Sequence, residues 1–220
     1  MLTGLAPLVS RNTRLLVLGS FPGAVSLAAQ QYYGHPQNQF WKILQAVWAD
    51  CPLPTGSNSY KIRSEWLLAR GLGLWDVYAA CERKGSLDSR IRKPVLNDFA
   101  NLKRTCSALQ GVAHNGGESF KHTRHVSAAL AGMEGMESSA LQPTTGLADP
   151  APKQGPRNRL CWTAGAAAPS GGSAVREATS EEVLFHRLPS TSPANASWSF
   201  ERKLAAWREV FEQHGLMDSQ

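Results

Sequence analysis

Four short apolar runs alternate with stretches of helical hydrophobic spacing along the chain. The runs cover residues 14–18, 73–78, 111–114 and 182–188, and helical patterns are found at 40–49, 59–69, 94–106, 118–126 and 198–214. Continuous apolar runs of this length are typical of parallel strands that are buried on both faces. Strands that alternate with helices predict an α/β fold, here a three-layer α/β/α sandwich with a central four-stranded parallel sheet.

Residues 127–180 do not share this pattern. Ala, Gly, Ser, Pro and Thr dominate the segment, and Trp162 is its only aromatic residue. Such a composition cannot bury enough apolar surface to offset the entropy lost on ordering. We therefore expect residues 1–220 to form a single domain that is interrupted by a disordered, low-complexity insertion at 127–180.

The composition narrows the class of protein. A chain of 220 residues, 42% of them hydrophobic and 18% charged, can form one soluble globular domain. The net charge of +6 favours polyanionic partners without singling out nucleic acid. No apolar run is long enough to span a membrane, and residues 1–14 lack a signal-peptide pattern. We therefore expect a cytoplasmic monomer with no membrane partner.

The four cysteines are scattered and form no CxxC pair. This spacing argues against a metal or iron–sulfur site and is typical of reduced thiols. We expect no metal and no other cofactor.

The exit of the first predicted strand is a candidate active-site loop. Residues 19–23, GSFPG, break the strand, and ligands of open α/β sheets bind beyond the carboxyl ends of strands. Many such turns carry no chemistry, so the motif alone is weak. Residues 35–41, HPQNQFW, strengthen it, because their polar and aromatic side chains suit a pocket that stacks on a flat ring and reads its edge. Alternatively, this is a polar loop whose aromatic residues belong to the core.

Two further strand exits carry polar side chains. Asn115 precedes two glycines, and its amide has both a donor and an acceptor for a base edge, although a turn asparagine is the alternative. The last strand leads into residues 189–196, a loop with two prolines and three hydroxyl side chains. The mixed-charge run 82–90 could contact phosphate through its basic residues, but such runs are more commonly solvated loops.

Together these motifs resemble the motif set of the uracil-DNA glycosylase superfamily. GSFPG, YYGHPQNQFW, NGG and LPSTSPAN are most similar to its hypoxanthine-DNA glycosylase branch, also described as DNA-deoxyinosine glycosylases. The mismatch-specific uracil/thymine glycosylases are similar through a GxxPG loop followed by HPxNxFW. The resemblance covers roughly residues 10–126 and 182–214 and has no counterpart for the low-complexity segment.

The resemblance implies an activity. Enzymes of this family bind double-stranded or single-stranded DNA along the carboxyl ends of the strands. They hydrolyse the N-glycosidic bond of a deaminated base and leave an abasic site, without a metal or cofactor. Hypoxanthine is the expected base here and uracil a further one.

The resemblance also implies roles for particular residues. Ser20 stands where the mismatch-specific branch has an asparagine that positions the attacking water. Asn38 of the second motif is therefore expected to be the main catalytic residue, assisted by Ser20 and the backbone amides of residues 20–23. Leu188 stands where strict uracil enzymes have a histidine that supports the departing base. That support would fall on backbone amides, on Asn115 or on another side chain.

The remaining expected site residues form two groups. The predicted base-binding residues are Phe21, Tyr33, His35, Phe40 and Asn115. The predicted DNA-contacting residues are Gly19, Pro22, Gly23, Arg83, Lys84, Ser190, Thr191, Ser192, Pro193 and Asn195.

Two other functions fit the same sequence. One is a mismatch-specific uracil/thymine glycosylase. The other is a DNA-binding relative with weak or no catalysis, which the serine at position 20 leaves open. In a bacterium the protein would associate with the nucleoid, and in a eukaryote it would act in the nucleus or an organelle.

Overall fold

The centre of the molecule is a parallel sheet of four strands. The computed structural model describes residues 1–54, 59–132 and 182–217. Its main sheet has the order β3–β2–β6–β7, with β3 at Leu72–Asp76, β2 at Leu15–Gly19, β6 at Gly111–Asn115 and β7 at Leu184–Leu188. All three pairings are parallel. The four predicted strands and their parallel arrangement are confirmed.

Strand β2 separates two hydrophobic cores. Leu15 and Val17 pack into one core with the aromatic side chains of Phe40 and Trp207. Leu16 and Leu18 point to the opposite face of the sheet and belong to the second core. This alternation follows from the two-residue period of a strand, and it explains why the run is apolar without interruption.

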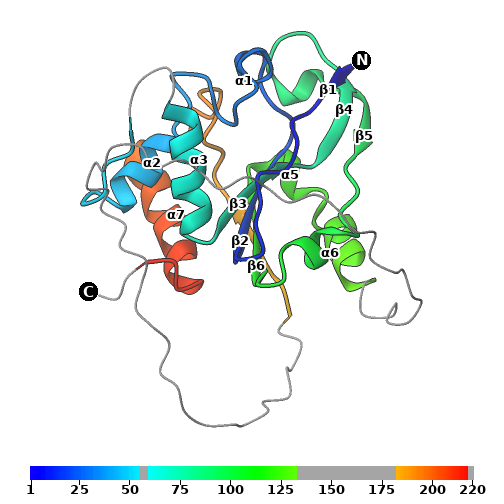
Figure 1. The fold of residues 1–220 in the computed structure, drawn as a ribbon. Helices are drawn as coiled ribbons and strands as arrows, with labels where there is room; N and C mark the ends of the chain where they lie inside the picture. The colour runs from blue at the N-terminus through cyan, green and yellow to red at the C-terminus, as the bar shows by residue number, and fades with distance from the viewer. Residues whose placement is uncertain (55–58, 133–181, 218–220) are drawn as a thin grey trace, which may run out of the picture.

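Helices cover both faces of this sheet (Figure 1). Helices α2, α3 and α7 lie together on one side, at Phe40–Val47, Ser59–Ala69 and Phe200–Gln213. Helices α5 and α6 lie on the other side, at Gly117–Phe120 and Thr123–Ala131. The predicted three-layer α/β/α sandwich is confirmed. The short helix α1, Ala24–Ala29, follows the GSFPG loop.

A second, smaller sheet was not predicted. Strands β1, β4 and β5, at Leu2–Thr3, Tyr78–Glu82 and Arg92–Leu96, pair antiparallel in the order β1–β4–β5. The short 3-10 helix η1, Asp88–Arg90, connects the last two strands. The predicted helix over residues 94–106 is therefore wrong at its start, and only α4, Leu102–Thr105, is helical. Pro94 lies in an edge strand, where a residue without an N–H donor is tolerated.

The predicted disorder of the insertion at 127–180 is wrong at its first residues. Helix α6 extends to Ala131 and buries Val126 and Leu130, so residues 127–131 are helical. The predicted disorder of residues 133–180 lies outside the described residues.

Within the described part of the chain, no helix has both the length and the apolar character needed to cross a membrane. The same residues contain no cluster of three or more metal-ligating side chains.

Candidate active site

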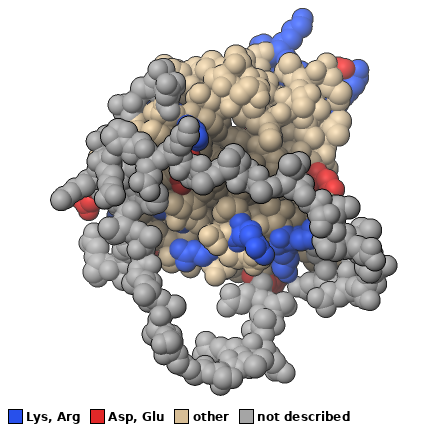
Figure 2. Space-filling model, viewed as in Figure 1, with Lys and Arg blue, Asp and Glu red and all other residues tan. Residues whose placement is uncertain are grey.

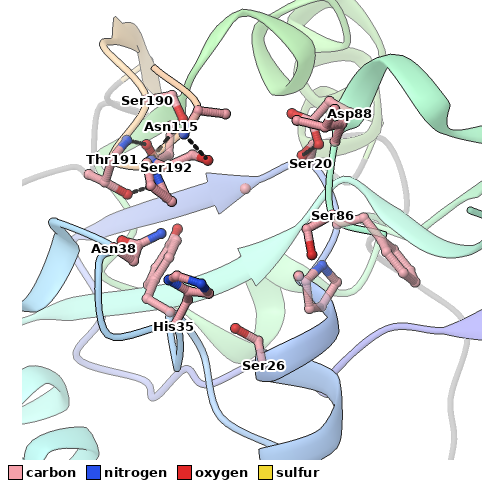
Figure 3. Close-up of a pocket in the computed structure, with 18 of the residues that line it drawn as sticks. Ser20, Ser26, His35, Asn38, Ser86, Asp88, Asn115, Ser190, Thr191 and Ser192 are labelled. Carbon is pink, nitrogen blue, oxygen red and sulfur yellow. Dashed lines mark hydrogen bonds between the residues drawn. The ribbon is translucent and has the colours of Figure 1, made fainter. Parts of the chain in front are cut away.

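The carboxyl ends of the parallel strands surround one cavity of about 550 Å³. Register alone brings these ends together, because Gly19 pairs with Asp76 and Asn115 pairs with Leu188. The side chains of Ser20, Asn38, Asn115 and Ser190 all line the cavity, although they come from four different segments (Figure 3). The four motifs therefore form a single site.

Most of the predicted site residues line this cavity. They are Gly19, Ser20, Phe21, Pro22, Gly23, Tyr33, His35, Asn38, Asn115, Ser190, Thr191, Ser192, Pro193 and Asn195. Three predicted residues, Phe40, Arg83 and Lys84, are not among the lining residues.

The GSFPG loop is held by the segment that follows β4. The Ser20 hydroxyl donates a hydrogen bond of 2.7 Å to Oδ1 of Asp88. The guanidinium of Arg83 donates to the carbonyl of Pro22 and lies 5.0 Å from the centre of the Phe21 ring. In Figure 3 the Ser20–Asp88 pair lies across the cavity from Asn38 and His35. Asp88 and Arg83 thus hold the GSFPG loop in place, and Ser20 and Phe21 of the loop line the cavity.

Asn38 has a fixed orientation at the start of α2. Its Oδ1 accepts a 2.9 Å hydrogen bond from the backbone N–H of Phe40, and its own N–H donates to the carbonyl of His35 at 2.9 Å. The side chain thereby satisfies an N–H of the first helical turn that has no partner within the helix. The amide is half-buried and lines the cavity with its orientation determined before any ligand binds.

Phe40 cannot stack on a base, and this prediction is wrong. Its side chain is fully buried, with the ring of Tyr33 packed on it at a centroid distance of 4.1 Å and Trp207 at 5.8 Å. The alternative reading of this aromatic residue, as part of the core, is the correct one. Tyr33 instead lines the cavity and has a backbone φ of +54°, a conformation that non-glycine residues rarely adopt. Burial raises the pKa of the Tyr33 hydroxyl, so it remains protonated.

Asn115 joins the third and fourth motifs. Its Nδ2 donates to Oγ1 of Thr191 at 2.9 Å, and its Oδ1 accepts from the Thr191 N–H at 2.9 Å. Thr191 is fully buried, so its side chain is placed to hold the loop and cannot reach a phosphate. Gly116 has a φ of +108°, and a Cβ at this position would lie 3.0 Å from the Cβ of Ser190. The glycine of NGG therefore allows the two loops to approach closely.

A buried lysine joins the last loop to the second motif. Nζ of Lys203 donates to Oε1 of Gln39 at 2.8 Å and to the carbonyl of Asn195 at 2.9 Å. The residue is only 1% exposed, and burial lowers its pKa. The N–H of Gln39 also donates to the carbonyl of Thr191 at 3.0 Å. These bonds hold the Asn38 segment and the Ser190–Asn195 loop as one unit.

Five polar residues of the cavity were missed by sequence reasoning: Ser26, Asp76, Ser86, Asp88 and Ser89. Asp76 is the last residue of β3 and is only 4% exposed. Its pKa is raised to about 7, chiefly by burial and then by the negative charge of Asp88, while Arg83 opposes the rise. A polar residue at the carboxyl end of a buried strand is the signal that identified Asn115, and it could have identified Asp76. Ser86 and Asp88 lie in the mixed-charge run, where sequence spacing gives no such signal.

Arg83 and Lys84 lie on a separate surface. They line a shallow depression with Met1, Leu2, Glu82, Arg90 and Arg92. Because the guanidinium of Arg83 binds loop carbonyls, its main observed role is to support the GSFPG loop. The phosphate contacts of both residues stay predictions. On the face shown in Figure 2, basic side chains gather across the lower part of the molecule.

Comparisons with known proteins agree with this geometry. The family model described as the uracil DNA glycosylase superfamily matches residues 6–212. A protein from Methanosarcina barkeri named hypoxanthine DNA glycosylase is 40% identical over 119 residues, which cover 54% of this chain and 73% of the relative. A protein of the same name from Methanosarcina acetivorans is 36% identical over 117 residues, covering 51% and 70%.

A solved structure has a fold similar to that of this chain. It is a solution NMR structure from Methanosarcina acetivorans, described only as a candidate uracil DNA glycosylase. It has a TM-score of 0.63 and 26% identity, and the match covers 97% of this chain and 98% of that one. From the extent of the family match, the shared fold and the joined motifs, we conclude that this chain belongs to the uracil DNA glycosylase superfamily.

Proposed function

We propose that this protein hydrolyses the N-glycosidic bond of deoxyinosine in DNA, releasing hypoxanthine and leaving an abasic site. The observation that carries the proposal is the single cavity in which Asn38 and the Ser20–Asp88 pair face each other. Two relatives named hypoxanthine DNA glycosylase support the choice of base.

The cavity has the size for a flipped nucleotide. Its volume of about 550 Å³ lies within the roughly 300–1,000 Å³ that is usual for small-molecule sites. Enzymes that act on a base of duplex DNA must extrude the nucleotide, which costs a few kcal/mol and less for a mismatched pair. Phe21 and Tyr33 provide the aromatic lining against which a purine ring can lie.

Asn38 is suited to hold the attacking water. As the bond to the base breaks, the sugar gains positive charge at C1′, and a water must be positioned to attack it. Oδ1 of Asn38 already accepts one hydrogen bond from Phe40, and its second lone pair can accept another from water. Because the amide is fixed before substrate binds, little entropy is lost in positioning the water.

Ser20 contributes as an acceptor. Its hydroxyl proton is donated to Asp88, so the oxygen can present lone pairs to the cavity. Asp88 is then a positioning residue that acts through Ser20. This arrangement supplies a negative charge near the GSFPG loop, although the loop itself contains no carboxylate.

The negative charge that develops on the departing base must be stabilised by groups other than Leu188 and the side chain of Asn115. Leu188 has no polar group, and the side-chain amide of Asn115 is engaged by Thr191. Backbone N–H groups of the GSFPG loop are fixed dipoles of the kind that stabilise developing negative charge.

The test is release of hypoxanthine from a duplex with one deoxyinosine, under single-turnover conditions with excess enzyme. We expect wild type to produce alkali-labile abasic sites. Asn38→Ala should slow this at least a hundredfold while the protein stays folded at the assay temperature, with a loss of stability of only about 0.5–2 kcal/mol from the missing hydrogen bond to Phe40. Lys42→Ala, on the exposed face of the same helix, is the matched control and should react at the wild-type rate. No release by wild type from deoxyinosine would overturn the proposed function, and full activity of Asn38→Ala would overturn the role of Asn38.

A further inference from the structure

Asp76 is a buried carboxylate whose Oδ2 has no hydrogen-bond partner among the described residues. The residue is 4% exposed, and its Oδ2 is buried with no hydrogen bond. Within the described part of the chain it takes part in no ion pair. Arg83, whose positive charge lowers the pKa of Asp76, uses its guanidinium on the carbonyls of Phe21 and Pro22. A buried carboxylate with no compensating partner is costly, and such groups are concentrated at functional sites.

The fold places this carboxylate in the cavity. Asp76 ends β3 in register with Gly19 and lines the cavity with Ser20 and Tyr33. A Cβ at position 19 would lie only 2.2 Å from Oδ1 of Asp76, so a glycine at this position gives the carboxylate its space. The backbone around Asp76 is also fixed, since its carbonyl accepts a 2.8 Å hydrogen bond from Nδ2 of Asn97. Register with β2 and the hydrogen bond from Asn97 therefore place the backbone of Asp76 at the edge of the cavity.

The missing partner must be a hydrogen-bond donor. Deamination of adenine creates one, because N1 is an acceptor in adenine and carries a hydrogen in hypoxanthine. The inference that follows rests on the proposed function, which brings hypoxanthine into the cavity. We propose that the Asp76 carboxylate accepts a hydrogen bond from N1–H of the flipped hypoxanthine and is a specificity-determining residue of this site.

The same contact rejects the undamaged base. At pH 8, above the raised pKa of Asp76, the side chain is ionised and can only accept hydrogen bonds. A carboxylate oxygen opposite N1 of adenine would then meet a lone pair instead of a proton, so adenine would leave two acceptors unpaired in a buried site. Sites built to bind one donor discriminate strongly against analogues that lack it. Guanine and thymine also carry a ring N–H, so other features of the cavity exclude them.

The test combines a protein change with a substrate change. Single-turnover rates are measured at pH 8, where Asp76 is ionised, for wild type and Asp76→Ala on duplexes with deoxyinosine or 1-methyldeoxyinosine, which lacks the N1 hydrogen. We expect methylation to slow wild type at least tenfold, Asp76→Ala to slow deoxyinosine release by a similar factor, and methylation to slow the variant less than threefold. Hydrogen bonds to charged groups are worth about 1.5–3 kcal/mol, which corresponds to roughly ten- to a hundredfold in rate.

Asp88→Asn is the matched control, because it removes the other carboxylate that lines the cavity. We expect it to slow both substrates and to leave the methylation factor of wild type unchanged. If Asp76→Ala does not fold, Asp76→Leu replaces it, since leucine has a similar shape, fills the same buried space and has no acceptor for N1–H. Equal methylation factors in wild type and the Asp76 variant would overturn the inference, whereas no hypoxanthine release by wild type would overturn the proposed function itself.

Discussion

Gly19 and Asp76 are register partners at the ends of adjacent strands, and the carboxylate of Asp76 occupies the space that a side chain at position 19 would need. A Cβ at Gly19 would lie 2.2 Å from Oδ1 of Asp76 and 3.7 Å from the Tyr33 hydroxyl. The first glycine of GSFPG is therefore required by a residue on the neighbouring strand. The backbone at Gly19 does not have a positive φ, so close approach is the reason for this glycine.

The first prediction concerns this close approach. Gly19→Ala should destabilise the protein by about 1–3 kcal/mol, because one methyl group is forced into a filled site. Gly117→Ala is the control, since a Cβ there would meet only Nη2 of Arg187 at an ordinary 3.4 Å. Urea unfolding measures the difference. In an Asp76→Ala background the obstructing carboxylate is gone, and the cost of Gly19→Ala should fall below about 1 kcal/mol. An equal cost in both backgrounds would contradict the stated contact.

The second prediction concerns the pH dependence of stability. The pKa of Asp76 is raised by burial to about 7 in the folded protein, against an ordinary value of 3.8. Between these values the unfolded chain has lost the proton while the folded protein retains it, so stability must fall as pH rises. Stability from this group is fully present below pH 3.8 and is lost as the pH passes 7. The rise in pKa corresponds to about 4 kcal/mol.

Asp76→Asn isolates this effect, because the amide does not titrate. The variant should gain stability relative to wild type by a few kcal/mol between pH 4.5 and pH 8, measured by urea unfolding at several pH values. The charged neighbours, Asp88 and Arg83, are present in both proteins, and their contributions largely cancel in the difference. Parallel curves for the two proteins over this pH range would show that Asp76 titrates normally.

The main sheet could be predicted because each of its strands is an apolar run between polar breaks. Strand β2 is fully buried on both faces, so no register or partner is needed to recognise it. The second sheet could not be found in this way. Strand β5 is mostly exposed and contains Pro94, and its pairing with β4 is irregular, so its conformation depends on a partner distant in sequence.

Some site residues could likewise be predicted from the sequence, whereas others are identified only by the packed structure. Motif spacing placed Ser20, Asn38 and Asn115 correctly at one cavity, because strand ends of a parallel sheet meet at one edge. It could not distinguish Phe40, which is core, from Tyr33, which lines the cavity, because both are aromatic residues of one motif. Lys203 lies on a helix whose exposed face is charged, and only the packed structure shows that its ammonium is buried.

The third prediction concerns Lys203. Lys203→Met keeps the length and apolar stem of the side chain but leaves Oε1 of Gln39 and the carbonyl of Asn195 without their donor. We expect a loss of about 1–3 kcal/mol in stability, because buried acceptors are left unpaired. Hypoxanthine release should also slow at least tenfold, since the Asn38 segment and the last loop lose their link. Lys42→Met, an exposed lysine on α2, should change neither quantity. Wild-type activity in Lys203→Met would show that the link is not needed for the site.

The fourth prediction concerns Asn115 and Thr191. Thr191→Val removes the hydroxyl that accepts from Nδ2 of Asn115 and preserves the shape of the side chain and the backbone N–H that donates to Oδ1. We expect a loss of about 1–2 kcal/mol in stability, since the amide donor of Asn115 is left in a buried site. Asn115→Ala should cost more, because it removes both hydrogen bonds and leaves a small cavity. In the double variant the two costs should not add, and the difference measures the coupling between the third and fourth motifs. Strict additivity in urea unfolding would mean that the two loops are held together by other contacts.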